Sequence, residues 1–295
     1  MSLLDPPNHF TLDGLAHAVR ESGPRAGEPM VLLHGFADTG ASFASLAAAI
    51  DAEAPGRYRF IAPDWRGHGD TGHAGRCYWF PEYLADLEAL LDALPGLAAP
   101  ITLVGHSMGG QVASFYAGLR PERVAHLVTL DSLNVPDADS SRAPRRYRRW
   151  LDAHRAPPSH AVHPDLATVS ERIGRRYPEL DGDTRHMLAA QWTRPVDGGR
   201  QWRFDPWHRA PFPQPFRIDD AMAIWREVRA AVLCIDAEDS PARALVAEAD
   251  MARRRACFID LTHRVMPGCG HMLHLEAPER VAALIRDFFG ETRRA

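Results

Sequence analysis

The sequence predicts an α/β protein in which helices cover both faces of a mostly parallel sheet, with an inserted helical cap. Short apolar segments alternate with segments of helical periodicity up to residue 131 and again after residue 227. Strands of a parallel sheet are buried on both faces, so they occur as such apolar runs. Between the two regions the alternation is lost, and proline, arginine and tryptophan become frequent. We therefore expect three parts: core residues 1–131, a helical cap at 132–227, and the remaining core at 228–295.

The composition is that of a soluble globular protein. The 295 residues are 45% hydrophobic and 24% charged, with a formal net charge of −4, so the total charge indicates neither nucleic-acid nor anionic-membrane binding. No window approaches the ~20 apolar residues of a membrane span, and the N-terminal residues do not resemble a signal peptide. The cysteines lack C-x-x-C spacing, which indicates reduced thiols in a cytoplasmic protein: Cys77, Cys234, Cys257 and Cys269.

The elements of the first part follow one another in a regular order. Asp13–Gly14 forms a turn signal between two short strands within Phe10 to Glu21. Apolar runs predict four further strands at 30–33, 60–62, 101–104 and 124–130. Helical periodicity predicts the intervening helices at 43–50, 81–94 and 112–119.

The second half contains the insertion and the end of the core. Helical faces predict four helices in the insertion, at 145–154, 166–177, 184–192 and 219–225. Residues 194–217 carry five prolines and an Asp197–Gly198 turn, which indicates a long irregular segment. The core then resumes with strands at 231–235 and 264–266 and a closing helix whose apolar face spans 281–289.

The chain is organised around one serine, Ser107, in the sequence I-T-L-V-G-H-S-M-G-G from Ile101 to Gly110. An apolar strand leads into this segment and an amphipathic helix leaves it. This is the context in which G-x-S-x-G forms a nucleophile elbow, a turn that lifts the serine hydroxyl above the sheet. Glycines suit the turn because strand and helix nearly touch there.

A serine hydroxyl becomes an effective nucleophile when a base accepts its proton and an acid orients that base. His271 is the candidate base, because Gly268 and Gly270 let the loop after the last strand turn back over the sheet. His274 and His106 are expected to support the structure, His106 because it points away from the nucleophile along the strand.

These motifs resemble those of the α/β-hydrolase superfamily over nearly the whole chain. The resemblance lies in four segments that occur in the family's order: 34–35, 64–69, 105–110 and 270–271. It implies a cofactor-free hydrolase without a metal. It also implies an oxyanion hole formed by the backbone N–H groups of Phe36 and Met108, where losing one such donor can cost ~3 kcal/mol.

The position of the acid departs from the usual family pattern. Most members carry it in the turn after the strand at 231–235, where this chain has Ser240. Asp131, at the end of the preceding strand, is our preferred acid, and Leu130–Asp131–Ser132 resembles serine hydrolase-like proteins that use this position. Asp239 is the main alternative and Asp236 the third candidate, and whichever aspartate is not the acid is expected to cap a helix.

A serine nucleophile points to acyl transfer, whereas dehalogenases and epoxide hydrolases of the superfamily carry an aspartate there. We expect the aromatic residues of the insertion to line an apolar pocket, with Trp207 and Trp225 as candidates and Trp65 contributing from the core. Four arginines at helical spacing form either a clamp for an anionic substrate or a solvated helix face: Arg142, Arg145, Arg146 and Arg149.

The sequence therefore predicts a carboxylesterase-like serine hydrolase that cleaves a small or medium apolar ester or thioester. Two alternatives stay open: a C–C bond hydrolase with the same triad, and a non-catalytic binder that has kept the fold. The expected partner is a small molecule, with no nucleic acid and no membrane span. Neither the oligomeric state nor the natural substrate can be assigned from the sequence.

Overall fold

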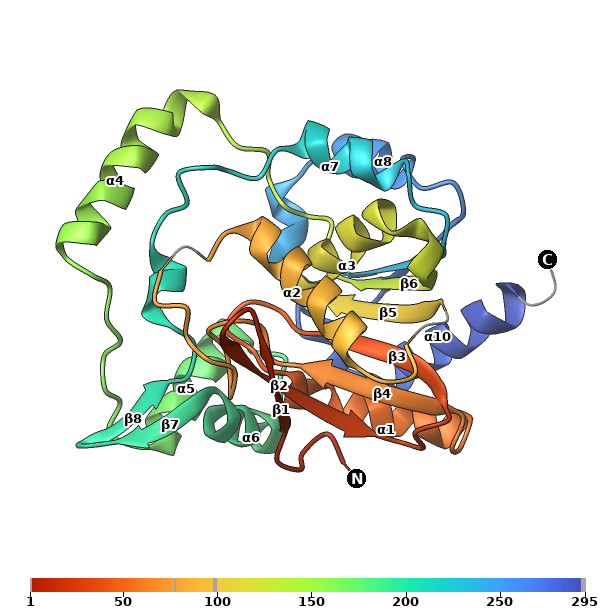
Figure 1. Cartoon of the computed structure of the whole chain (residues 1–295), viewed down its shortest axis with the longest axis horizontal. Coiled ribbons are helices and arrows are strands. Elements are labelled where there is room, and N and C mark those ends of the chain that lie inside the picture. The colour runs from red at the N-terminus through yellow and green to blue at the C-terminus, as the bar shows by residue number, and fades with distance from the viewer. Residues whose placement is uncertain (1, 77, 98–99, 293–295) are drawn as a thin grey trace.

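An eight-stranded sheet forms the centre of the computed structural model, which describes residues 2–76, 78–97 and 100–292 (Figure 1). The strand order is β1-β2-β4-β3-β5-β6-β9-β10. β1 and β2 are antiparallel to each other and β2 is antiparallel to β4, while all later pairings are parallel. The predicted mostly parallel sheet is therefore confirmed. Its strands are β1 (Asn8–Leu12), β2 (Leu15–Ser22), β3 (Glu28–Leu33), β4 (Tyr58–Pro63), β5 (Ile101–His106), β6 (Val124–Leu130), β9 (Ala231–Ala237) and β10 (Leu261–Met266).

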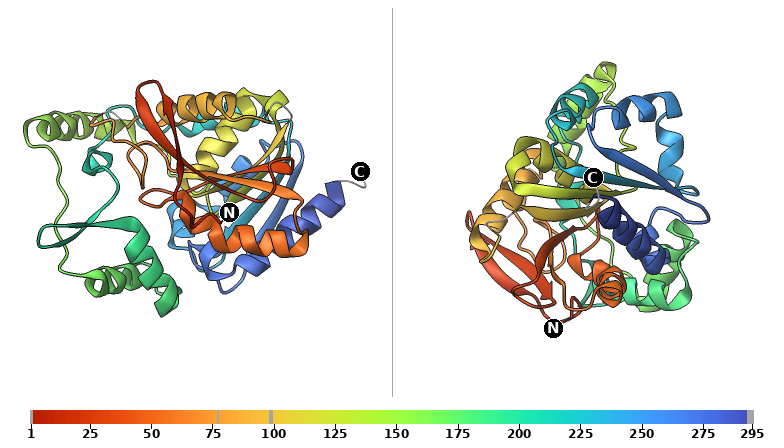
Figure 2. Two further views of the ribbon diagram at one scale, coloured as in Figure 1. Left: turned by 60° about the horizontal axis from the view of Figure 1, so that its bottom comes forward. Right: turned by 90° about the vertical axis from the view of Figure 1, so that its right-hand side faces the viewer.

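Helices cover both faces of this sheet, as the alternating sequence pattern predicts (Figure 2). Successive residues of a strand point to opposite faces, so Val31 and Leu33 join one hydrophobic cluster while Met30 and Leu32 join the other. The first cluster includes residues of α2 (Phe80–Ala93), α3 (Met108–Leu119), α7 (Ile218–Trp225) and α8 (Glu248–Arg255). The second includes residues of α1 (Ala44–Glu53), α9 (Leu273–Glu276) and α10 (Pro278–Thr292).

The segment between β6 and β9 adds no strand to the eight-stranded sheet. It holds α4 (Ala143–Arg155), α5 (Leu166–Arg176), α6 (Gly182–Trp192) and α7, and α4, α5 and α6 lie toward the left end of the molecule in Figure 1. α5 and α6 share a third hydrophobic cluster with Met272 and Leu275, which follow β10. α7 instead packs on α3, so close that a Cβ at Gly118 would lie 2.3 Å from the Ile224 carbonyl oxygen. The boundaries of a cap at 132–227 stay a prediction.

One expectation for this segment is wrong in detail. Residues 194–217 were expected to be irregular throughout, but β7 (Thr193–Val196) and β8 (Gly199–Trp202) pair as an antiparallel hairpin. The Asp197–Gly198 turn joins the two strands, and Gly198 adopts a φ of 79°, which glycine tolerates without strain. The hairpin forms even with Pro195 in one strand, and a β-bridge between His163 and Arg200 ties it to the preceding segment.

No helix in the described parts of the chain is long and apolar enough to cross a membrane. Three cysteines, Cys234, Cys257 and Cys269, are buried free thiols, whereas Cys77 lies outside the described residues.

Candidate active site

Ser107 lies in a tight turn between the end of β5 and the start of α3. Its backbone has φ 51° and ψ −119°, a conformation that residues with a side chain rarely adopt. Neighbouring glycines make this turn possible: a Cβ at Gly105 would lie 2.5 Å from the Gly109 carbonyl oxygen, and a Cβ at Gly109 would lie 2.0 Å from the Leu33 carbonyl oxygen. Strand and helix thus approach each other closely and leave Ser107 at the carboxyl edge of the sheet.

His271 bridges Ser107 and Asp131. Its Nε2 lies 3.2 Å from the Ser107 hydroxyl oxygen, and its Nδ1 lies 2.6 Å from Oδ2 of Asp131. Because the carboxylate accepts a hydrogen bond from Nδ1–H, Nε2 is left unprotonated as the acceptor for the serine proton. The Asp131 side chain is fully buried, whereas that of His271 is 18% exposed. The structure therefore brings together these three predicted residues from three separate strand ends.

The other two candidate acids lie elsewhere. Asp239 is exposed, and its backbone N–H donates to the Cys269 carbonyl oxygen at 2.9 Å. Asp236 is buried but contacts Nε2 of His263 at 2.8 Å and the Arg255 guanidinium at 3.6 Å. Of the three predicted aspartates, Asp131 is the one that contacts His271.

Ser240 contacts the candidate acid, a contact that the sequence does not predict. It occupies the position at which most family members carry the acid, and its hydroxyl donates a hydrogen bond to Oδ2 of Asp131 at 2.5 Å. The other carboxylate oxygen accepts weaker bonds from the Asn134 side chain at 3.3 Å and from the Ala237 N–H at 3.4 Å. The available signal was a small hydroxyl residue replacing the expected acid in the turn after β9.

The backbone N–H groups of Phe36 and Met108 are placed at the same edge. A Cβ at Gly35 would lie 3.2 Å from the Ser107 Cβ, so the loop carrying Phe36 passes directly beside the serine. Within the described chain, neither amide donates a hydrogen bond to another group. Both side chains line one cavity beside the serine. The two amides are therefore available to a ligand.

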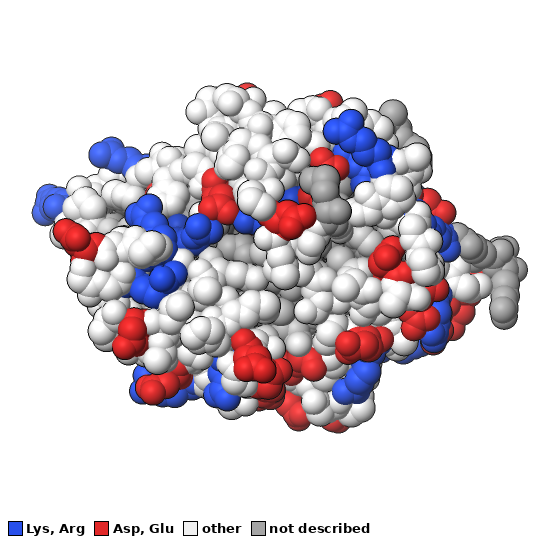
Figure 3. Space-filling view, turned by 90° about the horizontal axis from the view of Figure 1, so that it is seen from below, with Lys and Arg blue, Asp and Glu red and all other residues white. Residues whose placement is uncertain are grey.

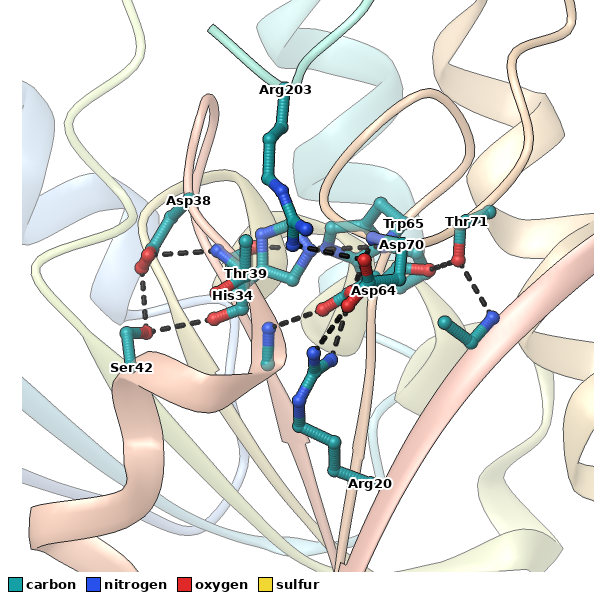
Figure 4. A network of polar contacts seen from close by, with 12 residues as sticks. Arg20, His34, Asp38, Thr39, Ser42, Asp64, Trp65, Asp70, Thr71 and Arg203 are labelled. Carbon is teal, nitrogen blue, oxygen red and sulfur yellow. Dashed lines mark hydrogen bonds and ion pairs between the residues drawn. The ribbon is translucent and has the colours of Figure 1, made fainter. Parts of the chain in front are cut away.

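A buried polar network fixes the loop that contains Phe36 (Figure 4). Asp64, which is fully buried, accepts hydrogen bonds from the Gly40 N–H at 2.7 Å and from Arg20 at 2.9 Å. The Trp65 N–H donates to Nε2 of His34, and its indole N–H donates to the His34 carbonyl oxygen, both at 2.9 Å. The motif at 64–69 thus holds the ends of β3 and β4 in a fixed relation.

Two further histidines lie close to His271: the ring of His106 contacts that of His271, and the ring of His274 contacts that of His106. His106 lies 2.8 Å through Nε2 from the His271 carbonyl oxygen, so it supports the backbone of the candidate base. Burial lowers the pKa of His106 well below its usual value and lowers the pKa of His274 to about 3, so both rings are neutral. The expectation that they are structural residues agrees with these contacts.

Asp38 links this region to the inserted segment. Its carboxylate accepts hydrogen bonds from the Trp192 indole at 2.6 Å, the Ser42 hydroxyl at 2.7 Å and the Thr39 N–H at 2.8 Å. Burial raises the pKa of Asp38 to about 6. Trp192 ends α6, so a buried hydrogen bond joins the insertion to the loop after β3.

Two groups of described side chains have potential metal ligands within 4.8 Å of one another. In the first, with His106 and His274, the Asp38 carboxylate is already bound by three donors. In the second, with Cys234 and His263, Asp236 is paired with His263 and Arg255. Neither carboxylate is free to bind a cation without breaking these contacts.

An aromatic cavity of about 400 Å³ lies beside Phe36 and Met108. Its other lining residues are largely aromatic and include Tyr78, Trp79, Phe80, Tyr83, Phe115, Phe212 and Phe216, with Gln111, Gln214, Arg217 and Asp220 among the polar ones. A second, more polar hollow of about 310 Å³ is lined by Ser107, His271 and Asp131 together with Gln111, Asn134 and Arg176. Since Gln111 lines both, the two spaces adjoin near the serine.

The three tryptophans proposed as pocket residues do not line either space. Trp65 and Trp225 are at most 2% exposed and belong to the core, where the Trp225 indole donates to the Ser114 hydroxyl at 2.9 Å. Their indole N–H groups find partners inside the protein, which permits full burial. Trp207 packs its ring edge to face with His154, with ring centroids 5.3 Å apart. These assignments are therefore corrected: the aromatic walls come from other residues.

The four arginines proposed as a clamp lie at the start of α4 and line neither space. Arg142 pairs with Asp139 at 3.3 Å, and Arg146 donates to the Pro213 carbonyl oxygen at 3.1 Å. In Figure 3, basic side chains gather at the left end, which the insertion forms in Figure 1. The arrangement fits the alternative of a solvated basic helix face.

Known proteins resemble this chain over most of its length. The serine hydrolase-like protein of Danio rerio is 27% identical over 287 residues, covering 90% of this chain and 82% of that protein. Lipase LipV of Mycobacterium tuberculosis is 29% identical over 284 residues, covering 92% of this chain and 97% of that protein.

Solved structures give the same result for the fold. A hypothetical protein from Pseudomonas aeruginosa PAO1 has a TM-score of 0.83 at 28% identity, covering 97% of this chain and 100% of that chain. A thioesterase domain from the curacin biosynthetic pathway shares the fold at a TM-score of 0.83 and 24% identity, covering 95% of this chain and 98% of that chain. The model of one family, described as the alpha/beta hydrolase family, matches residues 30–284. Because this match spans most of the sequence, the chain belongs to the alpha/beta hydrolase family.

Proposed function

We propose that the protein is a serine hydrolase that cleaves a small or medium apolar ester or thioester through an acyl-enzyme. The observation that carries this proposal is the pair of contacts made by His271, at 3.2 Å to the Ser107 hydroxyl and at 2.6 Å to the Asp131 carboxylate. A nucleophile, a base and an orienting acid in this order are the requirements for acyl transfer by serine.

Each group has a defined role in the proposed reaction. Ser107 attacks the substrate carbonyl carbon while Nε2 of His271 accepts its proton. The Phe36 and Met108 N–H groups stabilise the negative oxygen of the tetrahedral intermediate. His271 then donates the proton to the leaving group, and Asp131 stabilises the imidazolium throughout. Water, activated by His271, attacks the acyl-enzyme and releases the acid, which restores the Ser107 hydroxyl.

The aromatic cavity supports an apolar acyl group as the bound part of the substrate. It adjoins Phe36 and Met108, whose amides would hold the carbonyl oxygen, and its walls are largely aromatic. The second hollow includes His271, which must protonate the leaving group, so we place the leaving group there. A cavity of about 400 Å³ fits a small or medium acyl group.

Similarity to other family members supports the ester-bond class. Lipase LipV, at 29% identity over nearly the whole chain, is named for this class of reaction. Epoxide hydrolase B of Mycobacterium tuberculosis is 32% identical over 58% of the chain. An epoxide-opening enzyme of the superfamily is expected to carry an aspartate nucleophile, whereas this chain has Ser107. The serine therefore favours acyl transfer.

Hydrolysis of p-nitrophenyl esters from acetate to palmitate, with Ser107→Ala as the control, tests the proposal. We expect activity that depends on Ser107 and has its optimum at a short or medium chain. A fluorophosphonate probe should label the natural protein and leave the Ser107→Ala variant unlabelled. Labelling without hydrolysis of any ester would favour the C–C bond hydrolase, and absence of both would favour a non-catalytic binder.

A further inference from the structure

Ser240 lies where most family members were expected to carry the acid, yet in this chain it contacts the acid that comes from another strand. We infer that Ser240 positions the Asp131 carboxylate for His271. The inference rests on the proposed function, because it concerns the acid of the same triad.

The hydrogen bonds of the Ser240 hydroxyl show that it is the donor in its contact with Asp131. The Ala242 N–H donates to the Ser240 hydroxyl oxygen at 3.2 Å, so the hydroxyl proton is left for Oδ2 of Asp131 at 2.5 Å. The same Oδ2 accepts a hydrogen bond from the Nδ1–H of His271 at 2.6 Å. One carboxylate oxygen is therefore held between the histidine and the serine. Losing the Ser240 hydroxyl would remove one of the two short hydrogen bonds to Oδ2 of Asp131.

The neighbouring strands explain why both positions reach the same point. β6 and β9 are adjacent and parallel, so their carboxyl ends open at the same edge of the sheet. The Asp131 N–H donates to the Ile235 carbonyl oxygen at 2.8 Å, which ties the end of β6 to β9. Asp131 itself has φ 46°, and its Oδ1 accepts a hydrogen bond at 3.4 Å from the N–H of Ala237, the last residue of β9.

A simpler role for Ser240 is to cap the short helix at 241–245. Its hydroxyl oxygen accepts a hydrogen bond from the Ala242 N–H in the first turn of that helix. The two roles use different parts of the hydroxyl. Capping needs the oxygen as an acceptor, whereas positioning needs the proton as a donor. Loss of capping lowers stability alone, so reactivity and stability must be measured on the same variants.

The experiment measures ester hydrolysis and the rate at which a fluorophosphonate modifies Ser107, with thermal unfolding as the control for folding. We expect Ser240→Ala to slow both reactions about tenfold, as for the loss of one hydrogen bond to a charged group. Ser240→Thr keeps the hydroxyl and should recover most of this loss. Asp131→Ser should slow both reactions by about 10³-fold or more.

Two results would overturn the inference. One is a Ser240→Ala variant that reacts as fast as the natural protein; the other is a folded Ser240→Thr variant that reacts as slowly as Ser240→Ala. A different result identifies failure of the proposed function: if the natural protein does not react, or if Asp131→Ser reacts at the natural rate, the triad assignment fails and the inference falls with it.

Discussion

The polar edge around Ser107 and the aromatic cavity beside it are held by different forces. At the polar edge, buried side chains are fixed by short hydrogen bonds, such as those from His271 and Ser240 to Asp131. The cavity is enclosed by rings that pack against one another, such as Phe115 and Phe216 with centroids 6.1 Å apart. Hydrogen bonds demand specific partners, whereas apolar packing demands volume and shape.

Because of this difference, we expect polar substitutions to change the reactivity of the site and aromatic substitutions to change its preference among substrates. A changed polar group leaves a buried partner unsatisfied, so it should affect every substrate alike. A changed ring alters the space for the acyl group and should affect substrates according to their size. The following variants test this difference, in order of decreasing expected effect.

Asp131→Asn should have the largest effect, a loss of about 10⁴-fold in kcat, because an amide neither fixes the His271 tautomer nor stabilises its cation. Asp239→Asn is the matched control and should have little effect, since Asp239 is exposed and lies apart from His271. Steady-state kinetics on one ester compare the two. A larger loss for Asp239→Asn would move the acid to that residue.

Asp64→Asn should test the network that fixes the loop of Phe36. Because it turns an amide N–H₂ toward buried donors, including Arg20, we expect a loss of about 3 kcal/mol in the free energy of unfolding. Urea denaturation measures it. Glu53→Gln, which breaks an exposed ion pair with Arg286, is the control and should change little. Equal effects would show that burial of the network contributes nothing.

Phe216→Ala should change chain-length preference. Enlarging the cavity should raise kcat/KM for longer acyl chains relative to acetate by about tenfold, with fluorophosphonate labelling nearly unchanged. Trp207→Ala is the control, because Trp207 is aromatic and close in sequence but lines neither space. Equal losses of labelling and of long-chain hydrolysis in Phe216→Ala would contradict the separation of preference from reactivity.

Acid should destabilise the fold through its buried histidines. Burial lowers the pKa of His34 and His208 to about 4 and that of His274 to about 3, from 6.5. Between pH 6.5 and 4 the unfolded chain therefore binds more protons, so the free energy of unfolding falls as the pH falls. Asp38 acts in the opposite direction, since its pKa is raised from 3.8 to about 6. The several histidines outweigh this one carboxyl group.

His274→Gln measures the contribution of one such histidine. It should reduce the slope of unfolding free energy against pH by about 1.4 kcal/mol per pH unit between roughly pH 6 and 4. The same substitution at the exposed His186 is the control. Urea denaturation at several pH values gives both slopes, and equal slopes for the two variants would contradict the prediction.

Local patterns were sufficient to predict the sheet and the turn around Ser107. The strand, turn and helix around this residue lie within about twenty positions, so one segment carries the whole signal. Asp131 was the preferred acid because the carboxyl ends of parallel strands meet at one edge. The structure places it against His271.

Contacts between distant segments could not be predicted in the same way. Ser240 and Asp131 are 109 positions apart, and nothing in either local sequence states that their side chains meet. The tryptophans were difficult to assign for a related reason. Trp225 lies in the core and Trp79 lines the cavity, but the local sequence around each residue does not distinguish these two environments. Trp225 is buried because α7, which carries it, packs against α3.

The backbone of Ser107 has a consequence for the stability of the protein. A residue with a side chain in this conformation costs about 1–3 kcal/mol, whereas glycine would adopt it without that cost. Natural stabilities are only about 5–15 kcal/mol, so this one turn uses a substantial share of them. The position that is proposed to supply the nucleophile is therefore also one at which glycine, without the hydroxyl, would give a more stable chain.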